Sequence, residues 1–153
     1  MTSFWRVAFR LQYWLLQMMD PLIRAWWSRS GIGNVVELRV PHRDGRGVRS
    51  RMVGILRSGG HEYLGHPNGE VGWTRDLAAA GHADLVLPGG AEVEFRATRL
   101  PEGGERNGAI RATSQHPFPG NLVYRLGRRH VRTNGVFFRL DPETGPSGTP
   151  AKP

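Results

Sequence analysis

A glycine-rich turn that runs into a short helix is the stretch of this sequence best suited to chemistry. The turn covers residues 65–72 and includes His66, Pro67, Asn68 and Gly69. Trp73 begins the expected helix, which ends at Gly81. Backbone N–H groups at a helix start are unpaired and suit an anion such as phosphate, and a tryptophan offers a flat apolar face to a ring. The stretch therefore predicts a site for an anionic ligand that carries a ring.

Two histidines, His61 and His66, stand close to each other just before this turn. They are five residues apart, so they would not share one face of a helix, and the segment has the pattern of a strand. Ser114 and His116 have no acidic partner nearby that would indicate a catalytic triad. We therefore expect neither a metal site nor a catalytic side chain.

The composition limits the chemistry and the partners. The 153 residues suffice for one domain with a sizeable core, and without cysteine there are no disulfides and no thiolate chemistry. The formal net charge is +8, yet Lys152 is the only lysine among the 21 basic residues. A GC-rich coding sequence produces such an arginine bias, so nucleic-acid binding is not the preferred interpretation. A mildly basic solvated surface is preferred, with an anionic ligand or membrane surface as the alternatives.

The first thirty residues differ from the rest because they hold four of the five tryptophans. Apolar residues recur there at helical spacing: Phe4, Ala8, Leu11, Leu15, Met18 and Leu22. Asp20 is expected to cap a second helix, with Pro21 at its first position. Charged residues interrupt the apolar runs, so we expect neither a transmembrane span nor a signal peptide.

Two interpretations of residues 1–33 stay open. In the first, a helical pair packs on the core of its own domain. In the second, the segment lies in a membrane interface, with Trp and Leu among the headgroups and arginines beside anionic lipid. The excess of aromatic residues favours contact with a membrane surface, or a role as a lid that covers a ligand.

From Asn34 onward the pattern becomes that of short strands. Val36, Leu38 and Val40 alternate with charged residues, as on a half-buried strand, and Asp44-Gly45 is a hairpin signal. The expected strands cover residues 36–40, 49–57, 61–64, 83–87, 91–100 and 136–140.

Helices are few in this part of the chain. Residues 73–81 form the expected short helix, 101–116 form one diluted by glycine, and 117–133 resist assignment. Residues 141–153 hold four prolines and are expected to be disordered. Six short strands joined by tight turns predict a mainly β, α+β fold built on an antiparallel barrel. The expected organisation is a Trp-rich helical segment, a barrel domain and a tail, over residues 1–33, 34–140 and 141–153.

The order of these elements resembles the deazaflavin-dependent nitroreductase family. That family has a hairpin, a phosphate turn, a tryptophan and an Asn-Leu-x-Ala-Asn segment. Here the hairpin runs from Gly45 to Leu56, Trp73 matches the tryptophan, Asp76-Leu77 matches Asn-Leu, and Ala80-Gly81 matches Ala-Asn. The resemblance covers residues 14–140 and lies in order and spacing more than in identity. It implies a split antiparallel β-barrel related to pyridoxamine-phosphate oxidases.

The resemblance also implies a coenzyme site. The coenzyme would be an 8-hydroxy-5-deazaflavin of the F-420 type, with FMN as the second choice. Its ring would lie near Trp73, and its phosphate would lie at the turn, with Arg51 on the adjoining strand. The phosphate-turn lysine of the family is absent, so His66 or Arg75 would take its part. The implied cofactor-binding residues are Arg51, His66, Asn68, Gly69, Trp73, Arg75 and Asp76.

Asp76 places a negative charge where the family has a neutral side chain. Near an anionic coenzyme tail, that charge would need Arg75 or Arg51 to neutralise it. The implied contacts to the substrate are Tyr124 and Trp14.

Hydride transfer from the reduced coenzyme is the implied activity. The acceptor would be lipophilic, such as a nitroaromatic, a quinone or an unsaturated carbonyl. Two other classes stay open: a non-catalytic relative that binds a lipophilic ligand or a membrane surface, and a basic domain associated with nucleic acid. We expect the reductase, without a nucleic-acid partner, in the cytoplasm. A homodimer and peripheral contact of residues 1–33 with the inner face of the membrane are further expectations.

Overall fold

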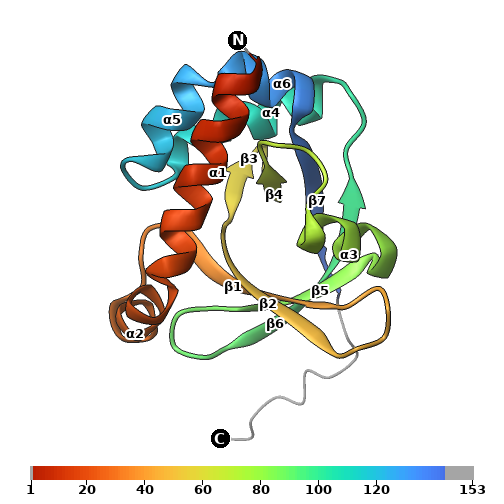
Figure 1. Ribbon diagram of the computed structural model, residues 1–153. Helices are drawn as coiled ribbons and strands as arrows, with labels where there is room; N and C mark the ends of the chain where they lie inside the picture. The colour runs from red at the N-terminus through yellow and green to blue at the C-terminus, as the bar shows by residue number, and fades with distance from the viewer. Residues whose placement is uncertain (1, 144–153) are drawn as a thin grey trace, which may run out of the picture.

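Seven antiparallel strands form one curled sheet in the computed structural model of the chain, which describes residues 2–143 (Figure 1). Across the sheet the strands lie in the order β2-β1-β5-β6-β7-β4-β3, and every neighbouring pair is antiparallel. The predicted α+β fold with an antiparallel barrel is thus confirmed. The strands are β1 (Val35–Pro41), β2 (Val48–Gly54), β3 (Leu56–Ser58), β4 (His61–His66), β5 (His82–Val86), β6 (Glu92–Arg99) and β7 (Val136–Pro142).

The two outermost strands, β2 and β3, are halves of one run of chain, so the chain itself closes the sheet. A bend at Ile55 separates them, where the sequence predicted one strand over residues 49–57. Asn34 fixes this bend, because its Nδ2 donates to the Ile55 carbonyl at 2.7 Å and its carbonyl accepts from the Ile55 N–H at 2.9 Å. Gly54 is required beside it, since a Cβ there would lie 2.5 Å from His116 Cε1. Before the bend, β2 pairs with β1 but not with β4, and this leaves the barrel split.

Alternation along the strands places one face of each in the barrel. In β1, Val36, Leu38 and Val40 are buried between half-buried neighbours. The helix α3 (Gly72–Ala80) lies against the barrel and adds Trp73 and Leu77 to its core, close to the predicted span 73–81. The other buried members of this core are Ile55, Leu64, Ala83, Leu85, Phe95, Ala97, Val136, Phe138 and Leu140.

A second core lies between the barrel and a layer of helices. The layer consists of α1 (Thr2–Met18), α4 (Gly104–Ala112), α5 (Gly120–Leu126) and α6 (Arg128–Asn134), with a 3-10 turn at Thr113–Gln115. The predicted helix 101–116 contains α4 and this turn, whereas α5 and α6 arise from the segment that the sequence left unassigned. The buried members of this core are Phe9, Leu56, Tyr63, Leu100, Ala109, Ile110, Ala112, Tyr124, Val131 and Phe137.

Helix α1 runs along one side of the barrel, and α5 lies beside it (Figure 1). It packs on the second core through Trp5, Phe9 and Tyr13. The helical stripe recognised in the sequence is a different set of residues, and its members are exposed or half-buried. Helix α1 therefore packs on the core of its own domain, as the first interpretation of residues 1–33 states, but it does so through a different face.

Helix α2 (Asp20–Ser30) follows α1 after a break at Met19, with Pro21 in its first turn. Met19 is the N-cap residue, so the prediction that Asp20 caps this helix is wrong. The reason is that the Asp20 carboxylate accepts a hydrogen bond from Arg24 Nε at 2.8 Å, one helical turn further on.

The described residues, 2–143, include no helix that is long and apolar enough to cross a membrane. Strand β7 continues to Pro142 because Asp141 and Pro142 pair with Arg96 and Phe95 of β6. The expected disorder of the tail therefore does not begin at Asp141, and residues 144–153 lie outside the described part. The division of the chain at residues 33 and 140 stays a prediction.

Candidate functional site

The turn that follows β4 is tied to two helices of the outer layer. Gly69 has a φ of +79°, and a Cβ there would lie 3.1 Å from the carbonyl oxygen of Asn134, so the turn requires glycine. The Asn68 side chain donates from Nδ2 to the Arg6 carbonyl at 3.2 Å and accepts from His130 Nε2 at 2.8 Å. The two predicted site residues Asn68 and Gly69 therefore hold the turn against α1 and α6.

His66 is buried at the end of β4 and is neutral at pH 7. Burial lowers its pKa to about 4, and its Nδ1 accepts a hydrogen bond from the Asn68 N–H at 3.3 Å. Its ring lies 4.8 Å from the Tyr13 ring and 6.2 Å from the Trp73 ring, measured between centroids. At pH 7 this imidazole offers a phosphate no positive charge.

Two tyrosine hydroxyls meet between α1 and α5, where Tyr13 Oη and Tyr124 Oη lie 2.9 Å apart. Burial raises the pKa of Tyr13 to about 12 and that of Tyr124 well above its ordinary value, so both stay protonated. One proton lies in the shared bond, and the other has no acceptor within residues 2–143. The pair therefore keeps one O–H donor for a ligand. His116, whose pKa burial lowers to about 4, covers Tyr124 at a ring distance of 4.8 Å.

Side chains of the protein itself form hydrogen bonds and contacts at the start of α3. Thr74 Oγ1 accepts a hydrogen bond from the Val71 N–H at 2.8 Å and donates to the Val71 carbonyl at 3.0 Å. The Arg49 guanidinium lies against Gly72, where a Cβ would be 3.1 Å from Nη1. The helix start that the sequence indicated as an anion site thus has a cation of the barrel beside it.

Asp76 is fully buried in an ion pair that ties α3 to the β1–β2 hairpin. Its Oδ2 accepts from Arg49 Nε at 2.6 Å, and its Oδ1 accepts from the Arg43 N–H at 3.4 Å. Burial alone would raise the pKa of Asp76, but these hydrogen bonds outweigh it and hold the pKa below its ordinary value. The expectation that Arg75 or Arg51 neutralises this charge is therefore wrong, because Arg49 does so.

Arg51 differs from the other strand arginines because it forms no ion pair within residues 2–143. Its Nη1 makes one long contact, to the Ser50 carbonyl at 3.5 Å. The strand arginines held by carboxylates are Arg39, Arg49, Arg57, Arg96, Arg99 and Arg139.

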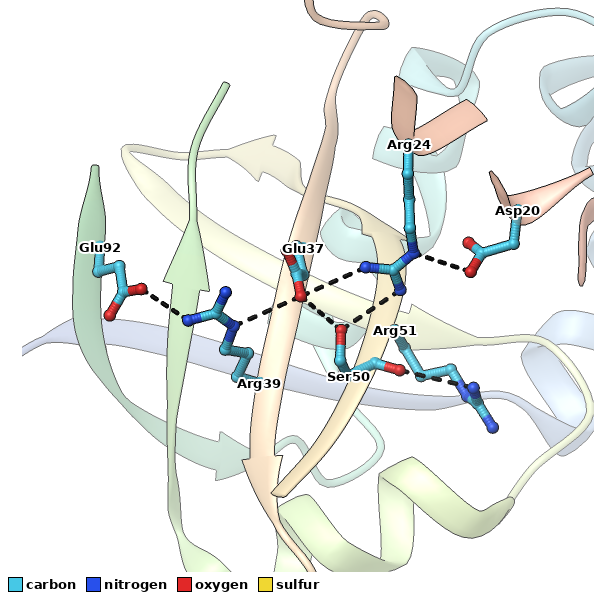
Figure 2. Close-up of polar contacts among 7 residues, drawn as sticks. All are labelled: Asp20, Arg24, Glu37, Arg39, Ser50, Arg51 and Glu92. Atoms are coloured by element: carbon cyan, nitrogen blue, oxygen red, sulfur yellow. Dashed lines mark hydrogen bonds and ion pairs between the residues drawn. The ribbon is translucent and has the colours of Figure 1, made fainter. Parts of the chain in front are cut away.

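The orientation of Arg51 separates it from the charge cluster on the outside of the sheet. Figure 2 shows Arg24 and Arg39 converging on Glu37, at 3.3 and 3.4 Å, while Arg51 points away from them. In the β1–β2 register Arg51 is opposite Leu38, which is fully buried in the barrel. The half-buried Arg51 therefore shares the barrel-facing side of β2.

Two other predicted residues, Arg75 and Trp14, lie at the surface. Arg75 Nε is 3.8 Å from Glu70 Oε2, and Arg99 Nη1 donates to Glu70 Oε1 at 2.5 Å. Trp14 is 54% exposed on α1. Both stand outside the buried cluster around His66.

Two hollows on the surface do not include the predicted site residues in their lining. One is at the β3–β4 turn, around Arg57, Glu62 and Asp141, and the other lies between the end of β6 and α6, around Arg106. The second adjoins the cluster, because its Val136 pairs with His66. In the part of the chain that the structure describes, no group of three His, Cys, Asp or Glu side chains could hold a metal ion. The candidate site therefore consists of the buried cluster around His66 and the split in the barrel between β2 and residues 65–72.

Tyr13 and Arg49 were missed by the sequence analysis as participants in this site. Tyr13 reaches Tyr124 across 111 residues, and Arg49 reaches Asp76 across 27. One signal could have found Tyr13: Trp5, Phe9 and Tyr13 recur every four residues, as on one face of a helix. No local pattern points to the role of Arg49.

Comparisons with known proteins bear on the fold. No family model matches the sequence, and no curated protein matches it. Among solved structures, the heme storage protein HutZ of Vibrio cholerae has a TM-score of 0.56 at 13% identity, over 83% of this chain and 92% of that chain. A candidate pyridoxamine 5′-phosphate oxidase of Listeria innocua has a TM-score of 0.51 at 14% identity, over 72% and 85%.

An F420-H2 dependent reductase, FDR-A, has a TM-score of 0.51 at 11% identity, over 71% of this chain and 94% of that chain. At such identities the likeness concerns the fold alone. The overall fold of the curled sheet agrees with these solved structures. The fold implied by the family resemblance is confirmed: this chain is a split β-barrel like that of the pyridoxamine-phosphate-oxidase-like proteins and F420-H2 dependent reductase.

Proposed function

We propose that this chain is an oxidoreductase that binds a reduced deazaflavin coenzyme of the F-420 type at the split between β2 and residues 65–72. The hydride acceptor is lipophilic: a nitroaromatic, a quinone or an unsaturated carbonyl. The single observation that carries the proposal is Arg51, a half-buried cation for which residues 2–143 supply no carboxylate. The fold shared with F420-H2 dependent reductase supports the choice of coenzyme.

Arg51 suits the anionic tail of such a coenzyme. A guanidinium presents its N–H donors in a fork that fits phosphate and carboxylate oxygens, and such charge-assisted bonds are roughly twice as strong as neutral ones. Because Arg51 is half-buried, it has lost part of its hydration without gaining a carboxylate, and an anion would replace what it lost. Arg75, exposed on α3 and 3.8 Å from Glu70, is the second cation proposed for the tail.

The buried cluster suits the coenzyme ring. Trp73 and His66 would border the ring, and the hydroxyl proton that Tyr13 and Tyr124 leave free would be donated to a ring or acceptor oxygen. All four side chains are neutral at pH 7, so they exclude water without adding a competing charge.

The remaining predicted residues have structural or substrate-binding roles in this proposal. Asn68 and Gly69 fix the turn, and Asp76 is a positioning residue that acts through Arg49. Trp14, on the exposed side of α1, would contact the lipophilic acceptor. A bound reduced deazaflavin supplies the hydride, so the side chains need only align donor and acceptor within about 3–3.5 Å and keep water away.

A titration of the purified chain with reduced and oxidised coenzyme, followed by tryptophan and coenzyme fluorescence, tests the proposal. We expect saturable micromolar binding, and we expect Arg51→Gln to weaken it by about tenfold or more. Arg96→Gln is the matched control, because Arg96 is also a strand arginine but is paired with Glu143. Absence of saturable binding at tens of micromolar, or equal binding by Arg51→Gln, would overturn the proposal.

Haem and FMN are the competing ligands in the same titration. One observation favours haem: His66 is buried, His116 is half-buried, both are neutral, and neutral imidazole is the form that ligates iron. A Soret band that His66→Gln or His116→Gln abolishes would decide for haem. The non-catalytic alternative predicts binding of a lipophilic ligand and of none of the three cofactors. The homodimer expected from the sequence is checked by sedimentation velocity.

A further inference from the structure

Helix α1 carries two separate apolar faces. At about 100° per residue, Trp5, Phe9 and Tyr13 fall in one sector, which packs on the second core. Arg6, Arg10 and other polar residues separate it on one side from a second apolar sector, which faces solvent. The second sector consists of Phe4, Val7, Leu11, Trp14, Leu15 and Met18, which are between 49 and 67% exposed.

Two further helices, α2 and α5, also carry exposed apolar residues. Leu22 and Trp26 of α2 are 73 and 68% exposed, and Leu122 and Leu126 of α5 are 37 and 61% exposed. Helix α5 lies beside α1, as the hydrogen-bonded tyrosine pair requires (Figure 1). These four residues and the second sector of α1 are termed the outer face. An exposed apolar surface contributed by three helices marks an interaction site.

The charges on the helices of the outer layer are unbalanced. Helices α1, α5 and α6 contain no Asp or Glu, and the Asp20 carboxylate at the start of α2 is held by Arg24. Five exposed arginines of α1, α5 and α6 form no ion pair within the described residues: Arg6, Arg10, Arg125, Arg129 and Arg132. The outer face therefore lies among helices that carry unmatched positive charge.

We propose that the outer face docks on an anionic membrane surface. Its aromatic and aliphatic side chains enter the headgroup region, and the unpaired arginines of α1, α5 and α6 contact lipid phosphates. A second copy of the chain fits less well, because an isologous contact would bring the same unmatched arginines together without a carboxylate between them. Helix α1 lies in the plane of the interface, since none of the described helices can span a bilayer. This inference does not depend on which coenzyme the barrel binds.

Flotation of the full chain with lipid vesicles tests the inference. We expect binding to vesicles of phosphatidylglycerol mixed with phosphatidylcholine, and much weaker binding to phosphatidylcholine alone. Binding should also weaken between about 0.1 M and 1 M salt, because salt screens the arginine contacts. Equal binding to both vesicle types, or no binding to either, would overturn the inference.

Substitutions on the outer face separate its two contributions. Leu11→Gln with Trp14→Gln should lower vesicle affinity by about tenfold or more, because each removes apolar surface from the headgroup region. Val48→Gln is the matched control, since Val48 is also exposed and apolar but lies on β2. Because all three side chains are exposed, thermal unfolding should change little, and this measurement checks that each variant folds.

The charge contribution has its own pair of variants. Arg10→Gln with Arg125→Gln should lower affinity for the anionic vesicles by roughly 30-fold, at about 1 kcal/mol for each arginine. The control is Arg96→Gln with Arg111→Gln, which removes the same charge from β6 and α4. Equal losses in both pairs would overturn the role of the outer face. So would a stable dimer in solution that Leu11→Gln with Trp14→Gln dissociates, because the face would then be a contact between copies.

Discussion

The barrel and the helical layer use the same arginine-rich composition in opposite ways. In the barrel, arginines meet carboxylates on neighbouring elements, as Arg39 meets Glu92 at 2.6 Å and Arg49 meets Asp76 at 2.6 Å. In α1, α5 and α6 there are arginines and no carboxylates at all. The difference suggests that paired arginines hold the barrel together, whereas unpaired ones are left to bind something outside the chain. Among the strand arginines, Arg51 is the exception, because it is unpaired within the described residues.

The largest expected effect tests whether the paired arginines stabilise the barrel. Asp76→Ala leaves Arg49 without its buried partner, so the free energy of unfolding should fall by about 3–5 kcal/mol. Urea unfolding followed by circular dichroism measures it. Glu92→Gln is the control, because its ion pair with Arg39 is exposed and should contribute less than about 1 kcal/mol. Similar losses in the two variants would mean that burial of the pair does not matter.

Lowering the pH should reduce stability at the boundary between the barrel and the helical layer. His66 and His116 have pKa values near 4 in the folded chain, below the value of about 6.5 expected when unfolded, so the unfolded state binds more protons between these values. Their stabilising contribution is complete above pH 6.5 and is lost as the pH falls towards 4. The free energy of unfolding should drop by about 2 kcal/mol per histidine between pH 7 and pH 5. Urea unfolding at several pH values measures it, and a slope unchanged in His66→Gln with His116→Gln would contradict the assignment.

The tyrosine pair gives a smaller and more local test of how the helical layer is held. A double-mutant cycle with Tyr13→Phe and Tyr124→Phe should give a coupling energy of about 1 kcal/mol, because each change removes the same hydrogen bond. Thermal or urea unfolding of the four proteins supplies the cycle. Strictly additive losses would show that the two hydroxyls do not interact in solution.

The smallest effect sharpens the contrast between paired and unpaired arginines. Arg51→Gln should change the free energy of unfolding by less than about 0.5 kcal/mol, since no ion pair within the described residues depends on it. Urea unfolding beside the coenzyme titration shows whether stability and binding separate at this residue. A large loss of stability would place Arg51 among the structural arginines instead.

The barrel could be predicted because its pattern is local. Val36, Leu38 and Val40 alternate with polar residues and are buried, and Asp44-Gly45 marks the hairpin between β1 and β2. The bend at Ile55 could not be predicted, because it depends on Asn34 and on the His116 ring against Gly54, both distant in sequence.

The helical layer was harder to predict. In α1 both apolar faces have helical spacing, and nothing in the sequence tells which one meets a core. Helices α5 and α6 are too short to be stable alone and form through packing, as the contact of Gly127 with Phe9 illustrates. For the candidate site, the turn at residues 65–72 was visible as a local signal, whereas its contacts to Tyr13, Arg6 and His130 depend on the folded chain.

Closure of the sheet by a bent strand has a consequence for how the barrel fluctuates. Strand β2 has β1 on one side and no partner strand on the other within the described residues, whereas β5, β6 and β7 are paired on both sides. Amide protons along that free edge should exchange with solvent sooner than those of the paired strands. Local opening would then begin at this seam, on the strand that carries Arg51, so a ligand bound there would be detected as slower exchange along β2.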